Sequence, residues 1–240
     1  MDVNKNSYIF AFSAILVVVV GGILAFAAES LKPMQKENVK LEKMQNILAS
    51  VKIEATPEEA KTKYDQYIVD EKLLDSEGNI LSESSLAAFD IDVVKEYKTM
   101  DADKRHYPLF IFEDQGKRKY IVPLAGKGLW GPIWGYVAFE GDLNTVYGST
   151  FDHKTETPGL GAEIKETWFQ DRFVGKTIFN ESGEFVSVEV VKGGTDVKGD
   201  DHRVDGISGG TITSKGVGEM IERTLNVYVP YFKTDVKAAL

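Results

Sequence analysis

The residues best placed to do chemistry lie in one short stretch near the C-terminus, from Asp205 to Ser214. It reads DGISGGTITS and places three glycines and four hydroxyl side chains directly before a pattern that predicts an amphipathic helix. Free backbone N–H groups at a helix start favour a phosphate, and glycines allow the backbone to approach it closely. A plain turn with a serine or threonine cap explains the same residues. On these residues alone, both interpretations stay open.

Two other stretches concentrate glycine in an otherwise ordinary composition. Residues 156–163 read ETPGLGAE, in which Pro-Gly followed by Leu-Gly predicts a rigid turn with exposed backbone. Residues 126–136 read GKGLWGPIWGY and contain Trp130 and Trp134. Either tryptophan could simply fill the core. Trp130 is the better candidate for contact with a ligand, because it precedes the strand that is expected to contain Trp134.

In this order along the chain, GKGLWG, ETPGLG and DGISGGT resemble the motifs of the FMN-binding domain family. The flavin-attachment motif of that family has an aspartate, two variable residues, serine or threonine, and then glycine-alanine-threonine. Here the matching positions are Asp205, Ser208, Gly209 and Thr211. The sequence departs at Gly210, where alanine is usual, and the smaller glycine should fit while adding flexibility.

The resemblance implies that FMN is bonded covalently, through a phosphoester, to the hydroxyl of Thr211. A separate flavin transferase would take the FMN from FAD. Thr213 and Ser214 are the alternative acceptors. The resemblance also places Thr157 and Leu160 against the flavin ring, with Glu156 close by. Because a carrier has no substrate pocket of its own, no catalytic acid or base is expected, and no residue is expected to bind a metal. The full set of expected cofactor-binding residues is Asp205, Ser208, Gly209, Gly210, Thr211, Trp130, Glu156, Thr157, Leu160 and Gly161.

Within this family, the chain resembles the membrane-anchored flavin subunits of sodium-translocating NADH:quinone oxidoreductases. The long segment before Tyr107 and the sequence GLWGPIWGY favour this branch over the flavin subunit of Rnf electron-transport complexes. The resemblance implies one- or two-electron relay from NADH on another subunit toward quinone, coupled to sodium export, without turnover by this chain alone. The implied partners are subunits of types A, B, D, E and F, the flavin transferase and the lipid bilayer.

Two alternatives come from other classes of protein. One is a membrane-anchored binding domain that holds another phosphate ligand and no flavin. The other is a free flavoenzyme that reduces a small substrate. GKGLWG has the spacing G-x-G-x-x-G, but a strand and not a helix is predicted after it, whereas the dinucleotide fingerprint opens a helix; the sequence therefore contains no sign of a nicotinamide site.

An uncharged run from Tyr8 to Ala28 predicts a membrane span. At ~1.5 Å per residue, its 21 residues reach ~31 Å, about the thickness of a bilayer's hydrocarbon core. The alternative is a signal peptide cleaved near Ala25-Phe26-Ala27, but signal-peptide cores usually run about 7–15 residues. We therefore expect a retained, single-pass anchor.

The charges around the span leave its orientation open. Lys5 precedes the span, and four lysines follow it by residue 43, which by a simple count puts the large domain inside. Long domains often cross the membrane regardless of nearby charge. The resemblance implies the opposite arrangement, in a bacterial inner membrane with the flavin domain on the periplasmic side.

Composition excludes several classes. The formal net charge of −9 and the pI near 5.0 argue against nucleic acid as a partner. The chain has no cysteine, which removes disulfides, iron–sulfur clusters and thiolate metal sites. Its three histidines are far apart and lack ligand-like spacing.

The patterns around these motifs predict an α+β fold, in which an N-terminal transmembrane helix precedes a mostly antiparallel sheet packed with helices. We expect a tail (1–7), the span (8–28), a helical linker with the first part of the soluble domain (29–106), and an FMN-binding domain (107–240). The expected helices are 34–51, after a break at Pro33, 56–68 with a capping box, and 215–229. The expected strands are the hairpin 108–125, then 133–140 and 146–148, and a second hairpin formed by 176–179 and 185–191.

Overall fold

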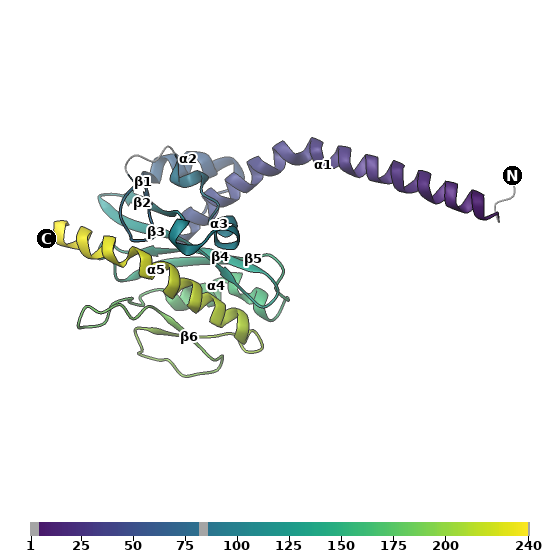
Figure 1. The fold of residues 1–240 in the computed structure, drawn as a ribbon. Coiled ribbons are helices and arrows are strands. Elements are labelled where there is room, and N and C mark those ends of the chain that lie inside the picture. The colour runs from purple at the N-terminus through teal and green to yellow at the C-terminus, as the bar shows by residue number, and fades with distance from the viewer. Residues whose placement is uncertain (1–4, 82–85, 240) are drawn as a thin grey trace. The chain divides into compact units, whose positions relative to one another are not determined.

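The uncharged N-terminal run forms the first part of one long helix, α1 (Asn6–Ser50), in the computed structural model, which describes residues 5–81 and 86–239. The predicted break at Pro33 is wrong, because that residue lies inside α1. Figure 1 shows α1 as one continuous helix. A proline removes one main-chain hydrogen bond but keeps a helical φ, and the residues on both sides form helix readily. The chain separates into two compact units, with the boundary between Lys43 and Met44.

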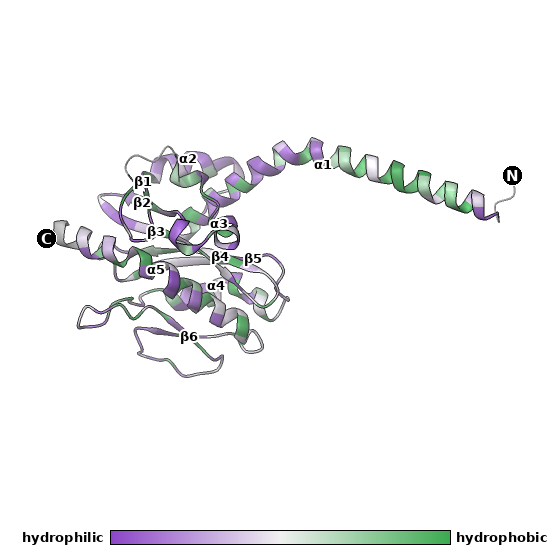
Figure 2. Ribbon diagram, viewed as in Figure 1, coloured by the Kyte–Doolittle hydropathy of each residue, from purple (hydrophilic) through white to green (hydrophobic). Residues whose placement is uncertain are grey.

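The first unit carries the predicted span. Among the described residues, α1 is the one helix long and apolar enough to cross a bilayer, and no residue of its most apolar window is buried. Figure 2 shows apolar residues around this part of the helix, and large ones such as Phe10, Val18 and Phe26 are exposed. A helix that is apolar on every side and unburied within the chain has the surface expected of a membrane anchor.

The second unit is built on a five-stranded antiparallel sheet whose strands follow one another in chain order. The predicted hairpin is confirmed, and strand 146–148 extends further than predicted. The first strand was not predicted, because its sequence, IVDEKLL, has three consecutive charged residues and no regular alternation of apolar and polar side chains. The strands are β1 (Ile68–Leu74), β2 (Tyr107–Asp114), β3 (Lys117–Lys127), β4 (Pro132–Phe139) and β5 (Val146–His153).

Both faces of this sheet are covered. Along β2, Leu109 and Ile111 point into a core that they share with the long C-terminal helix, whereas Phe110 and Phe112 point into a second core under the end of α1. Successive side chains of a strand alternate between faces, so a strand buried on both sides is apolar throughout. This burial explains the unbroken LFIF run of β2.

Helices close the two cores. The C-terminal helix α5 (Thr211–Ala239) begins before the predicted start and ends beyond the predicted end, and its expected apolar face is buried. On the other face lie the end of α1 and α2 (Pro57–Tyr67), and the side chain of Glu59 accepts a hydrogen bond from the backbone of Thr56. Hydrogen bonds from Lys63 and from the Thr56 backbone lower the pKa of Glu59. The shorter helices are η1 (Ala88–Asp90), α3 (Val93–Thr99), η2 (Ala102–Lys104), η3 (Gly161–Lys165), α4 (Thr167–Gln170) and η4 (Asp171–Phe173).

The predicted second hairpin forms only around its turn. Phe179 and Phe185 make an isolated antiparallel bridge, flanked by hydrogen bonds from the Asn180 N–H to the Glu184 carbonyl and from the Val186 N–H to the Ile178 carbonyl. The N–H groups of Ile178 and Phe179 donate to the side chain of Asn144, and the predicted longer strands are absent from this described segment. The later part of the predicted strand becomes β6 (Glu189–Val191), which pairs in parallel with β7 (Arg203–Asp205). This pairing leads the chain from β7 directly into the glycine-rich stretch before α5.

Candidate functional site

The three glycine-rich stretches meet in space at one end of the sheet. They contribute the turn between β3 and β4, the segment after β5, and the N-terminus of α5. Together they line an open cavity of about 220 Å³. Its lining residues are Leu129, Trp130, Glu156, Thr157, Leu160, Gly161, Gly209, Gly210, Thr211, Ile212 and Thr213.

A close contact between α5 and β3 brings two of these stretches together. A Cβ on Gly216 would lie 2.5 Å from the carbonyl oxygen of Lys127, the last residue of β3. The absence of a side chain at Gly216 therefore allows the helix to rest on the strand end. Just beyond, the N–H of Gly128 donates to the carbonyl of Gly131 at 2.8 Å and closes the turn that carries Trp130.

The carboxylate of Glu156 joins all three stretches. Its Oε1 accepts a hydrogen bond from the backbone N–H of Trp130 at 2.8 Å, and its Oε2 accepts one from the hydroxyl of Thr213 at 2.6 Å. The residue is buried, and a Cβ on Gly161 would lie 2.5 Å from both Oε2 and the Thr213 hydroxyl. Glu156 thus lines the cavity and connects the three stretches that form it.

The three candidate acceptor hydroxyls have different environments. Thr213 and Ser214 are each 1% exposed. The hydroxyl of Thr213 is bonded to Glu156, and that of Ser214 donates to the Gly210 carbonyl at 2.9 Å and accepts from the N–H of Ile207 at 3.0 Å. Thr211 is half-buried, lines the cavity and is the first residue of α5. Access from the cavity therefore favours Thr211.

The two glycines before Thr211 face Leu160. Gly209 has a φ of +80°, the left-handed region that favours glycine, and a Cβ there would lie 2.6 Å from Leu160 Cδ2. A Cβ on Gly210 would lie 3.0 Å from the Leu160 carbonyl oxygen, a tight distance that a small shift relieves. The family's usual alanine at this position is thus nearly accommodated.

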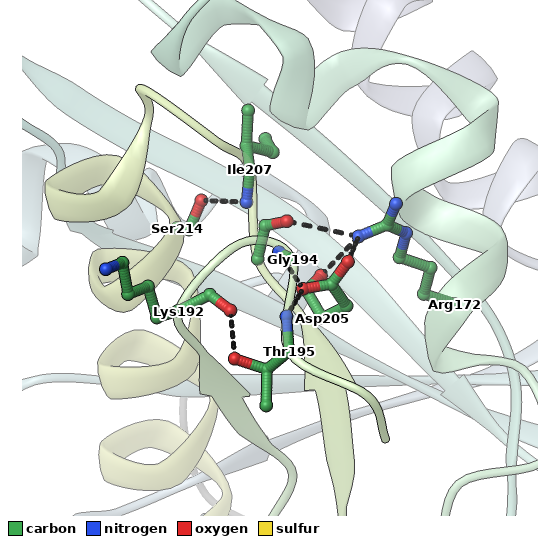
Figure 3. A network of polar contacts seen from close by, with 8 residues as sticks. Arg172, Lys192, Gly194, Thr195, Asp205, Ile207 and Ser214 are labelled. Carbon is green, nitrogen blue, oxygen red and sulfur yellow. Dashed lines mark hydrogen bonds and ion pairs between the residues drawn. The ribbon is translucent and has the colours of Figure 1, made fainter. Parts of the chain in front are cut away.

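Asp205 and Ser208 have a different placement from the other predicted residues, because neither is among the described residues that line the cavity. Asp205 Oδ1 accepts hydrogen bonds from the backbone N–H groups of Gly194 and Thr195 at 2.8 and 3.1 Å. Its Oδ2 lies 3.2 Å from Arg172 Nη1 (Figure 3). Ser208 is exposed on the turn that follows.

Arg172 completes this network, and no sequence pattern pointed to it. Its Nη1 also donates to the backbone carbonyls of Asp205 and Gly206, at 2.6 and 3.1 Å, and its guanidinium lies over the ring of Trp168. Figure 3 shows the Arg172 side chain pointing toward Asp205, on the segment that leads to Ile207 and the helix. This network fixes the approach to Thr211 from outside the cavity.

The rim of the cavity is apolar. Trp130 is 67% exposed, Ile212 59% and Leu160 42%, which is unusual for large apolar side chains in one small area. Trp134 lies within β4 and is half-buried, outside the lining. The site therefore combines an exposed apolar rim, a helix N-terminus with backbone N–H groups, and an accessible hydroxyl at that terminus. These features fit a planar aromatic ring with a phosphate at one end.

The same features recur in known proteins. The chain matches the FMN-binding domain family over residues 128–226. It is 34% identical to the C subunit of the Na(+)-translocating NADH-quinone reductase of Vibrio alginolyticus over 209 residues, 81% of this chain and 80% of that protein. It is 32% identical to the corresponding C subunit of Pseudomonas aeruginosa over 229 residues, 87% of each chain.

Two solved structures are also similar. The C subunit of the Parabacteroides distasonis reductase shares 46% identity at a TM-score of 0.75, covering 84% of this chain and 96% of that one. NqrC of Shewanella oneidensis shares 27% identity at a TM-score of 0.67, covering 82% and 99%. Fold and site together define an FMN-binding domain that follows an N-terminal apolar helix. The chain belongs to the family of the C subunit of the Na+-translocating NADH-quinone reductase. The predicted family branch and fold class are confirmed.

Proposed function

We propose that this chain is the electron-carrying subunit of a Na+-translocating NADH-quinone reductase and holds its FMN through a phosphoester to Thr211. The observation that carries the covalent link is the contrast among three hydroxyls. Thr211 opens into the cavity at the first residue of α5, whereas Thr213 and Ser214 are buried and hydrogen-bonded. FMN supplies the redox chemistry when it is bound, and the protein binds, orients and shields it.

Each part of the cavity has a task in this proposal. The backbone N–H groups and positive end of α5 stabilise a phosphate on Thr211. Leu160 and Trp130 flank the ring, while Thr157 borders the same space. Attachment by a flavin transferase would break the pyrophosphate bond of FAD, join the FMN phosphorus to the Thr211 oxygen, and release AMP with the hydroxyl proton. A permanently bonded carrier never needs to release its cofactor.

The chain is a carrier and the sodium path lies in other subunits. The residues from Tyr8 to Ala28 include no charged side chain, and charged or polar groups mark ion paths within membranes. The relatives are named as subunits of a reductase that uses NADH and quinone, and the other subunits would supply both sites. In this proposal α1 anchors the chain in the bacterial inner membrane, with the flavin domain on the periplasmic side.

In-gel fluorescence tests the covalent link. The full chain is co-expressed with a flavin transferase, separated on a denaturing gel and imaged under ultraviolet light, beside Thr211→Ala and Thr213→Val. We expect fluorescent bands for the parent and for Thr213→Val, and a dark band for Thr211→Ala. Fluorescence in Thr211→Ala would move the bond to another residue. A dark parent band, with transferase activity confirmed on a known substrate, would favour a binding domain without covalent flavin.

A further inference from the structure

The buried carboxylate in the cavity has no role in the bond to Thr211. Glu156 is 5% exposed and lines the cavity, and the two groups that donate hydrogen bonds to its carboxylate, the Trp130 N–H and the Thr213 hydroxyl, are uncharged. Both of its oxygen atoms accept hydrogen bonds, as an ionised carboxylate does. The hydrogen bonds to the negatively charged carboxylate therefore come from uncharged donors.

A neighbouring histidine does not offset that charge. The backbone N–H of Glu156 donates to Nδ1 of His153 at 3.2 Å, which assigns the single ring proton to Nε2 and makes the imidazole neutral. His153 Nε2 is itself buried without a hydrogen-bond partner in the part of the chain that the structure describes. His153 therefore fixes the backbone of Glu156 without contributing a positive charge.

We propose that the Glu156 carboxylate sets the midpoint potential of the bound flavin, holding it low by disfavouring added negative charge in the cavity. The inference rests on the proposed function, because it requires FMN in this cavity. Reduction adds electrons to the ring, and a fixed negative charge in the same low-dielectric space opposes that addition. The hydrogen bonds to Trp130 and Thr213 keep the carboxylate in place, so its effect is the same in every molecule.

The test compares two glutamates of the same glycine-rich stretch, 156–163. Glu156→Gln removes the cavity charge and keeps the side-chain shape. Glu163→Gln removes a charge from the same segment, where its carboxylate accepts from the Gly159 N–H and lies outside the cavity lining. Each full-length variant is flavinylated, purified in detergent, and titrated to equilibrium against a redox dye of known potential.

We expect Glu156→Gln to raise the ratio of reduced to oxidised flavin about tenfold at a fixed ambient potential, or about 30 mV for a two-electron couple. Glu163→Gln should leave the ratio within about twofold of the parent. Glu156→Asp, which keeps the charge but shortens the reach, should retain a low potential while it lowers the melting temperature. This third variant separates the effect of the negative charge from the effect of the side-chain hydrogen bonds that connect the cavity walls.

The outcomes distinguish this inference from the proposed function. Fluorescent Glu156→Gln with the parent's potential would overturn the role of the charge and leave the covalent flavin intact. An equal rise in Glu163→Gln would also overturn it, because the effect would then be one of overall charge. A dark parent band overturns the proposed function itself. If Glu156→Gln fails to fold, as judged by circular dichroism, a raised potential in Glu156→Asp contradicts the inference.

Discussion

Two carboxylates near the N-terminus of α5 have different roles. Glu156 lines the cavity and connects the three glycine-rich stretches, whereas Asp205 is not among its lining residues and pairs with Arg172. Both residues fall in motifs that resemble the family's flavin motifs. A residue that belongs to a ligand-binding motif therefore need not contact the ligand. Glu156 lines the cavity and can contact a bound ligand, whereas Asp205 holds the backbone that leads to Thr211.

The largest effect should follow removal of the outer carboxylate. Asp205→Ala leaves the N–H groups of Gly194 and Thr195 without their acceptor and removes the carboxylate partner of Arg172, and hydrogen bonds to charged groups contribute roughly 1.5–3 kcal/mol each. We expect the free energy of unfolding to fall by about 3 kcal/mol and flavin incorporation to fall at least tenfold. Urea melts and in-gel fluorescence measure the two. A fully flavinylated variant with the stability of the parent would contradict the role given to Asp205.

Gly209→Ala should perturb the cavity side of the same loop. An alanine at φ +80° costs roughly 1–2 kcal/mol, and its Cβ would also push against Leu160. We expect a comparable loss of stability in chemical denaturation and an altered flavin absorption spectrum, because Leu160 borders the cavity. An unchanged spectrum would argue that Leu160 does not contact the ring.

Arg172→Lys tests whether the charge of Arg172 or the shape of its guanidinium group stabilises the contacts with Asp205 and Gly206. Lysine keeps the positive charge but lacks the planar fork with which arginine reaches the Asp205 carboxylate and two backbone carbonyls. We expect a loss of about 1 kcal/mol in unfolding free energy and a few-fold slower flavinylation in a time course with purified transferase. Rates equal to the parent would show that an ion pair alone suffices.

Gly210→Ala should have the smallest effect and serves as the control for Gly209→Ala. Its φ is not in the left-handed region, and its Cβ requires the Leu160 carbonyl to move by a few tenths of an ångström. A gain of roughly 0.4–1 kcal/mol from reduced freedom of the unfolded chain should offset that contact. We expect a melting temperature within about 2 °C of the parent and full flavinylation. A loss as large as that of Gly209→Ala would contradict this account of the two positions.

The sequence predicted the features that depend on local pattern. Alternating and continuous apolar runs indicated the antiparallel sheet, the Thr56 capping box located α2, and the three glycine-rich stretches located the cavity. Glycine is informative in this way because only a residue without a side chain allows two backbone segments to approach most closely. The contact of Gly216 with the end of β3 is one such case.

What the sequence could not predict depends on contacts between distant segments. Where a longer second hairpin was predicted, the N–H groups of Ile178 and Phe179 donate to the side chain of Asn144, more than thirty residues away. The partnership of Arg172 with Asp205 is of the same kind, since a lone arginine in a mixed sequence has no periodic signature. The roles of the expected site residues toward FMN stay predictions.

The most direct test of the central claim is to locate the flavin on the chain. The flavinylated protein is digested, and the peptide that contains residues 205–214 is fragmented in a mass spectrometer. We predict that the added mass of one FMN, less one water, falls on Thr211 and on no other residue of the peptide. The same added mass on Thr213 or Ser214, or an unmodified peptide from a yellow, flavinylated preparation, would contradict the account.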